Sequence, residues 1–306
     1  MELKDFEFKR ERKLGEFVQD FINLLKLIVT HVCKVLTKLL ALPIAAMLLV
    51  GYYLSTQLNM NVNYSSGELV RVLSASFGAI GIMLVIGMFA FGLAIEYFIL
   101  MRNMRHISFS EKEVWAQFKK NIGKYMRFLG AGIVVAILSI LPIGILMAAC
   151  AIIPFVGNIA MGILLAMVGL WYFTAFMLYR EGYAELIDAF QNAFAMLKAK
   201  FFEYGAASYI VQFLFQTLLY LVTLMPAIVF GILAYNSVGF NENFFDTTFG
   251  KLLTSLGGSV LTIFIIVYNI LSVLSYGIIY ETAKEMKFGE NVFDRIAKIG
   301  RRPDAQ

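Results

Sequence analysis

Charged residues are scarce in this chain of 306 residues: Asp, Glu, Lys and Arg make up 15% of it, whereas hydrophobic residues make up 60%. The mean hydropathy is +0.76. Soluble domains usually contain about 25% charged residues and about 45–50% apolar ones. The shortage of charge therefore excludes an ordinary soluble domain and indicates an integral membrane protein.

Histidine and cysteine are nearly absent, with two residues of each. Cys33 and Cys150 are too far apart for the paired spacing of a zinc site, and two histidines cannot build a histidine-rich metal centre. The sequence also contains no phosphate loop, nucleophile elbow or zinc-protease motif. We therefore expect a protein that is not an enzyme and that has no metal or other cofactor.

The sequence does contain long stretches without a charged residue. The longest, from Phe128 to Tyr179, has 52 residues and divides at the turn signal Pro154-Phe-Val-Gly157. A helix needs about 20 apolar residues to cross a bilayer. The chain is therefore predicted to be all-α, with six transmembrane helices at 36–57, 73–101, 128–153, 156–179, 206–234 and 252–280.

The basic residues fall almost entirely on one side of these spans. Of the 26 Lys and Arg residues, all but Arg71 and Lys251 lie in the segments that this topology places together. Basic residues mark the cytoplasmic side, so both termini are predicted to be cytoplasmic. The net charge of +5 then points to anionic lipids of the inner leaflet as partners rather than to nucleic acid.

Three segments on the cytoplasmic side have the periodicity of amphipathic helices, near 14–28, 114–125 and 186–201. Helices of this kind beside a span often lie in the membrane interface. The second has the most basic polar face, and we interpret it as a contact to lipid headgroups; the alternative is that the helices only brace the spans. The headgroup candidates are Lys112, Trp115, Lys119, Lys120 and Lys124.

The same arrangement recurs three times along the chain: an amphipathic helix, a span that contains a proline, and a return span that ends in a glutamate. The glutamates are Glu96, Glu181 and Glu281. Membrane helices bend at proline, so we expect kinks there. The prolines are Pro43, Pro142 and Pro226.

The whole chain, 1–306, is thus predicted to be one membrane domain of three helical hairpins. The repeat units are 12–101, 110–181 and 183–281, followed by a cytoplasmic tail at 282–306. All three units have the same orientation, as in parallel repeats related by an axis along the membrane normal.

Glu96 is the acidic residue most deeply placed within a predicted span. An ionisable residue in a membrane is a candidate proton or cation site, because its burial there is costly. The alternative is that Glu96 pairs with a nearby base such as Arg102 or Arg105, or that it is simply hydrated. The sequence leaves both interpretations open.

A polar edge marks the last two spans. Gln212 and Gln216 lie four residues apart on one helical face, and Asn269 belongs to the following span. These side chains are candidates to line a polar path through the bundle. Hydrogen bonding between helices, worth about 0.6 kcal/mol for each bond, also explains them well and is the simpler interpretation.

Two stretches resemble a known family. They are Glu181–Phe194, with the sequence EGYAELIDAFQNAF, and the region from Glu281 to Gly300. The chain is similar to a bacterial six-span family related to the membrane domain of glycerophosphoryl diester phosphodiesterases, in a subgroup often labelled beta-carotene monooxygenase. The resemblance implies a six-span domain in a bacterial cytoplasmic membrane, and neither label transfers as an activity.

Two functions follow from these patterns. The first is a non-enzymatic inner-membrane protein that interacts with lipids, or that scaffolds or assists a membrane protein complex. The second is a transporter or channel for a small or lipid-like solute through the helical bundle. A dense bundle favours the first function, and a polar cavity that reaches Glu96 or Gln212 favours the second. The sequence leaves the oligomeric state open.

Overall fold

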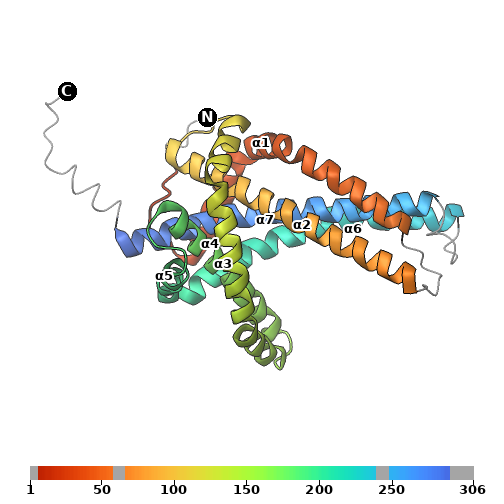
Figure 1. Ribbon diagram of the computed structural model, residues 1–306. Helices are drawn as coiled ribbons and strands as arrows, with labels where there is room; N and C mark the ends of the chain where they lie inside the picture. The colour runs from red at the N-terminus through yellow and green to blue at the C-terminus, as the bar shows by residue number, and fades with distance from the viewer. Residues whose placement is uncertain (1–5, 58–65, 239–247, 290–306) are drawn as a thin grey trace, which may run out of the picture. The chain divides into compact units, whose positions relative to one another are not determined.

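The computed structural model describes residues 6–57, 66–238 and 248–289 (Figure 1). Every regular element in these ranges is helical, as the sequence predicts. The helices are α1 (Leu14–Gln57), α2 (Ser66–Met104), α3 (Glu111–Ala151), α4 (Val156–Glu181), α5 (Asp188–Leu197), the 3-10 turn η1 (Lys198–Lys200), α6 (Phe201–Val238) and α7 (Thr248–Phe288).

Five helical stretches in the described chain are long and apolar enough to cross a membrane. This agrees with the predicted class, an all-α membrane protein with several spans. The remaining predicted span, 206–234, falls within α6. The five stretches are Leu14–Val50, Val85–Met104, Glu111–Ala151, Val156–Glu181 and Ile266–Phe288.

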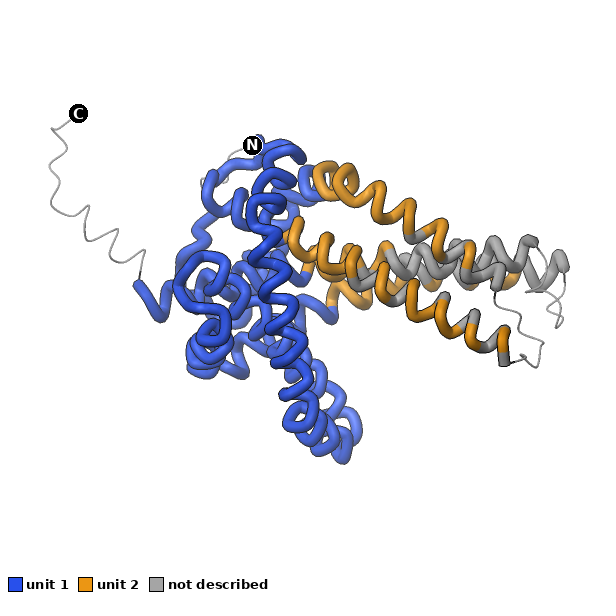
Figure 2. Tube along the Cα trace, in the orientation of Figure 1, with its two compact units in different colours: residues 1–32, 95–213, 272–306 blue, residues 33–94, 214–271 orange. Residues whose placement is uncertain are grey.

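The structure forms two compact units (Figure 2). Unit 1 comprises residues 1–32, 95–213 and 272–306, and unit 2 comprises residues 33–94 and 214–271. Unit 1 contains α3, α4 and α5 together with the adjoining parts of α1, α2, α6 and α7. The three repeat units remain a prediction.

Helix α4 packs closely against its neighbours within unit 1. A Cβ atom added to Gly169 would clash with the Tyr276 side chain of α7, and one added to Gly162 would clash with Tyr209 of α6. Without side chains at these positions, the helix surfaces approach one another closely. Helices α4 and α7 therefore pack side by side within unit 1.

The turn between α3 and α4 lies where the sequence predicts it. Helix α3 ends at Ala151, and α4 begins at Val156. Phe155 has a φ of +64°, and a Cβ atom on Gly157 would overlap the carbonyl oxygen of Cys150. Only glycine fits at position 157, because the two backbones approach closely here.

The amphipathic segments differ from the prediction in one respect. The first two are not separate helices but the N-terminal parts of α1 and α3, which continue without a break into the apolar stretches. No helix-ending signal separates the two parts of α3, so the intrahelical hydrogen bonds simply continue. Only the third, α5, is a separate helix, and η1 connects it to α6.

The prolines do not interrupt their helices. Pro43 and Pro142 lie inside α1 and α3, and position 226 falls within the bounds of α6. Helix kinks at the three prolines remain a prediction.

Candidate functional site

The glutamates at the ends of the three predicted repeats form buried ion pairs in unit 1. These lie in two clusters, which the consecutive residues Arg180 and Glu181 of α4 connect and which are together called the network. Glu96 lies on α2, Glu181 is the last residue of α4, and Glu281 lies on α7. The side chains of Glu96 and Glu281 are 0% exposed, and that of Glu181 is 11% exposed. Buried carboxylates need partners, because loss of hydration is costly for a charge.

Arg180 of α4 is the partner of Glu96. Its Nε and Nη2 atoms donate to Oε1 and Oε2 of Glu96, both at 3.1 Å, in a two-pronged contact. The hydroxyl of Tyr125 on α3 donates to Oε1 at 3.1 Å. Arg180 is 84 residues away in the sequence and is neither of the local bases that we considered. The contact joins α2, α3 and α4.

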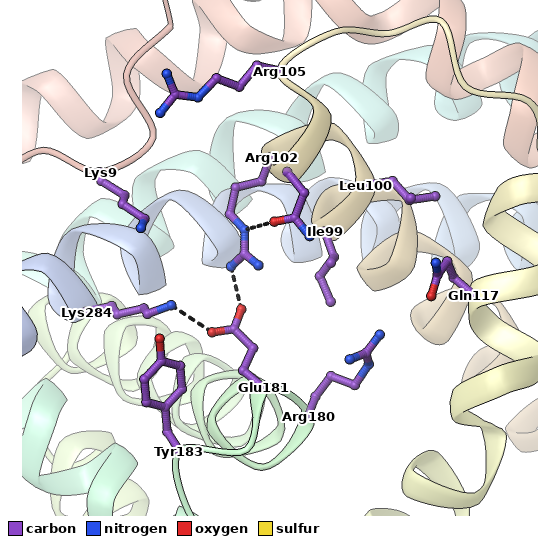
Figure 3. A pocket seen from close by; sticks show the side chains of 11 residues that line it. Lys9, Ile99, Leu100, Arg102, Arg105, Gln117, Arg180, Glu181, Tyr183 and Lys284 are labelled. Carbon is purple, nitrogen blue, oxygen red and sulfur yellow. Dashed lines mark hydrogen bonds and ion pairs between the residues drawn. The ribbon is translucent and has the colours of Figure 1, made fainter. Parts of the chain in front are cut away.

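Arg102 connects the other two glutamates. Its Nη1 atom donates to Oε1 of Glu181 and to Oε1 of Glu281, both at 2.5 Å. Glu181 has two further donors, because Lys284 Nζ and the hydroxyl of Tyr280 each lie 2.9 Å from its Oε2 (Figure 3 shows the bonds from Arg102 and Lys284). Arg102 thus joins the ends of α2, α4 and α7.

A pocket of about 550 Å³ opens beside this network. Its wall contains five cationic side chains and a single carboxylate, that of Glu181 (Figure 3). A cavity lined by charges of one sign concentrates counter-ions of the other sign, so this pocket attracts anions. The cationic residues are Lys9, Arg102, Arg105, Arg180 and Lys284.

Arg105 is the exposed cation of the pocket wall. It follows the last residue of α2 with a φ of +53°, while its backbone N–H donates to the carbonyl oxygen of Met101 at 3.0 Å. Non-glycine residues rarely adopt this conformation, which ends the helix here. Within the described ranges the guanidinium of Arg105 makes no ion pair, so it is available to an incoming anion.

The segment before α1 brings Lys9 to the pocket, and Arg12 holds this segment in place. Arg12 is 1% exposed; its guanidinium donates to the carbonyl of Phe8, the hydroxyl of Thr282 and the carboxylate of Asp20, at 2.9, 2.9 and 2.7 Å. Burial lowers the pKa of Arg12, and the bond to Asp20 offsets part of that effect. Arginine stays protonated even so, because its pKa starts far above neutrality.

The predicted headgroup residues on α3 lie outside this pocket. Lys112, Trp115, Lys119 and Lys120 are exposed. Lys124 is half-buried, and its Nζ donates to the carbonyl oxygen of Arg180 at 3.0 Å. This bond satisfies one of the last carbonyl groups of α4, which have no partner within the helix. Four of the five candidates therefore form an exposed basic face, and the fifth has a partner inside unit 1.

The predicted polar edge is divided between the two units. In unit 1, Gln212 Nε2 donates to the hydroxyl of Tyr276 at 2.5 Å, a bond between α6 and α7. Gln216 and Asn269 belong to unit 2, where Gln216 bonds to Tyr220 on its own helix. A polar path through the bundle remains a prediction.

Of the cationic partners in the network, Arg102 was named from the sequence, as a partner of Glu96, whereas Arg180 and Lys284 were missed, although a signal was present. Each repeat glutamate has a base within six residues: Arg102 after Glu96, Arg180 before Glu181, and Lys284 after Glu281. The structure exchanges the first two partners, because Glu96 pairs with Arg180 and Arg102 pairs with Glu181.

Within the described ranges no group of three His, Cys, Asp or Glu side chains is placed to hold a metal ion. No protein-family model, curated protein or solved structure matches the chain. The family resemblance noted above therefore remains a prediction.

Proposed function

We propose that this chain is a non-enzymatic, multi-pass protein of a bacterial cytoplasmic membrane that binds the anionic headgroup of an inner-leaflet lipid in the basic pocket. In this proposal six helices cross the membrane as three hairpins, and both termini are cytoplasmic. The bound lipid would serve to organise the surrounding bilayer or to assist a membrane protein complex.

One observation carries the proposal: five cationic side chains and one carboxylate line the pocket. Arg180 and Arg102 pair with Glu96 and Glu281, which do not line the pocket. Five cations are thus opposed by three carboxylates, so the balance of charge at the wall is positive. Arg105 contributes a charge that no described side chain pairs with. Phosphate groups suit such a wall, because guanidinium and ammonium groups form strong charge-assisted hydrogen bonds to their oxygens.

A lipid, rather than a soluble anion, fits the surroundings of the pocket. Gln117 of the pocket wall comes from α3, the helix that also presents the exposed basic face with Trp115. Large apolar side chains around α5 are exposed as well, among them Ile187, Phe194 and Phe202. Aromatic and apolar groups beside basic residues are typical of a surface that rests in the membrane interface.

The test compares two double variants of equal charge. Arg105→Gln with Lys9→Gln removes two cations from the pocket, and Lys119→Gln with Lys120→Gln removes two from the exposed face of α3. The protein is purified in mild detergent, and the phosphatidylglycerol that remains bound is measured by mass spectrometry. We expect the pocket variant to retain about one tenth or less of the phosphatidylglycerol that the wild type retains. The reason is that charge-assisted hydrogen bonds are worth about 1.5–3 kcal/mol each.

The control variant should retain its lipid within about twofold, because exposed charges that act at a distance contribute only about 1 kcal/mol each. Equal losses in the two variants would show a general attraction of charge and not a pocket. A wild-type protein that retains no anionic lipid would overturn the proposal altogether.

A further inference from the structure

Glu281 is bonded less completely than the other two glutamates. Its side chain is 0% exposed, its Oε1 accepts one hydrogen bond from Arg102, and its Oε2 has no hydrogen-bond partner within the described ranges. By contrast, both oxygens of Glu96 and both oxygens of Glu181 accept bonds. Among the described residues, Arg102 is therefore the only hydrogen-bond donor to Glu281.

Glu181 and Glu281 share one nitrogen atom of Arg102. Since each Oε1 lies 2.5 Å from this nitrogen, the two oxygens are at most 5 Å apart. Two carboxylates this close repel each other when both are charged, so a proton on one of them is favoured. Lys284 and Tyr280 stabilise the charge of Glu181, which leaves Glu281 as the site for the proton.

The charged groups around Glu281 come from four parts of the chain. Arg102 faces it from α2, Glu181 from α4, and Tyr280 and Lys284 from its own helix α7. The fourth is Arg12 of the N-terminal segment, which bonds to the neighbouring Thr282. Each of these groups also bonds to a partner other than Glu281.

Arg102 also belongs to the pocket wall. An anion in the pocket competes with the two carboxylates for the same guanidinium. When Arg102 turns toward the anion, Glu281 loses its only hydrogen bond while it remains buried. A buried carboxylate without a partner is very unfavourable, and the uptake of a proton removes the charge.

We propose that anion binding in the pocket is coupled to protonation of Glu281. The inference rests on the proposed function and adds a regulation of the same site. One phosphate group of a lipid accepts hydrogen bonds from Arg102, and one proton from the cytoplasmic solution binds to Oε2 of Glu281. The charge of the anion is then balanced by the proton, and the site holds anionic lipid more tightly at lower pH.

The experiment uses the full-length protein in nanodiscs of phosphatidylcholine, with phosphatidylglycerol as the added probe. The phosphodiester of this lipid keeps a single charge over the range in which histidine titrates. We expect the affinity to rise as the pH falls, by up to about tenfold for each pH unit, because one proton is linked to one anion. Glu281→Gln, which mimics the protonated side chain, should bind with an affinity that does not change with pH.

Two controls separate Glu281 from other titrating groups. His106 lies in the same loop as Arg105, and the variant His106→Asn should keep the pH dependence of the wild type. Proton uptake by the wild type on lipid addition is also measured in weak buffer, which needs no variant to fold. We expect close to one proton for each bound lipid.

The outcomes distinguish the two proposals. No binding of phosphatidylglycerol at any pH overturns the proposed function. Binding to the wild type that is independent of pH, without proton uptake, overturns the coupling and leaves the pocket intact. A pH dependence that persists in Glu281→Gln also overturns the coupling, because another group would then take the proton.

Discussion

Arg102 uses one nitrogen atom to bond to carboxylates on two different helices. The network contains the carboxylates of Glu96, Glu181 and Glu281 and an equal number of cations, so removal of one cation leaves an unbalanced buried charge. An incomplete buried ion pair costs much more than the intact pair contributes. Substitution of a single charged residue in this network is therefore expected to destabilise the protein strongly.

We expect Arg102→Gln to lower the stability of the protein by about 3–5 kcal/mol, the usual cost of breaking a buried ion pair. The matched control is Arg105→Gln, which removes the same charge from an exposed side chain three residues away. This substitution should change the free energy of unfolding by less than about 0.5 kcal/mol. Thermal unfolding of the purified protein in detergent checks both values; equal effects would show that Arg102 is not buried in an essential pair.

The pair between Glu11 and Lys200 is an exposed counterpart of this network. The hydrogen bond from Lys200, at 2.8 Å, lowers the pKa of the Glu11 carboxyl below its usual value. Its contribution to stability is therefore present above the pKa of the unfolded chain and is lost as the pH falls through the folded value. In Lys200→Gln we expect the pKa of Glu11 to rise to its ordinary range, as measured by NMR titration, with little change in stability.

At the scale of the helices, the turn between α3 and α4 depends on one glycine. Gly157→Ala would place a Cβ atom against the carbonyl oxygen of Cys150, so the backbone would have to move. We expect a clear loss of stability, whereas Gly144→Ala should be neutral or stabilising by about 0.5–1 kcal/mol, because position 144 is open and helical. Unfolding temperatures of the two variants in the same detergent make the comparison.

The basic face of α3 can be tested through its tryptophan. Trp115 is 42% exposed, whereas the indole of Trp171, the second tryptophan of the chain, donates to the carbonyl of Phe190 at 2.8 Å. In Trp171→Phe the fluorescence reports Trp115 alone. We expect quenching by lipids brominated near the headgroup, since tryptophan prefers the membrane interface. Quenching only by bromine at the ends of the acyl chains would contradict the interfacial position.

The elements also show what sequence patterns can and cannot predict. Charge-free runs and the Pro154–Gly157 signal were sufficient for the α3–α4 hairpin, because both act over a few residues. The continuity of α1 and α3 was missed, since amphipathic and apolar stretches were taken as separate elements. The pairing of Glu96 with Arg180 could not be predicted, because it depends on how α2 packs against α4 and not on any local spacing.

At the scale of the whole molecule, the topology is the prediction with the widest consequences. The loops around Asn63 and Asn241 are expected on the outer side of the membrane and lie outside the described residues. In a variant without Cys33 and Cys150, a cysteine at either position should react with an impermeant reagent added from the periplasmic side. A cysteine at Lys119 should react only from the cytoplasmic side.

Labelling at Asn63 from the cytoplasm would overturn the orientation and, with it, the assignment of the basic pocket to the inner leaflet. The three-hairpin arrangement would need revision if only one of the two outer loops reacted from the periplasm.

The arrangement of the buried charges along the chain has a consequence for biogenesis. Glu96 is synthesised 84 residues before its partner Arg180, and Arg102 is synthesised 179 residues before Glu281. Because chains emerge from the ribosome N-terminus first, the early helices enter the membrane with their charges uncompensated. The last ion pairs of the network can form only after α7 has been synthesised, because Glu281 and Lys284 belong to this helix. A chain truncated before α7 lacks these partners, and we expect proteases to degrade it.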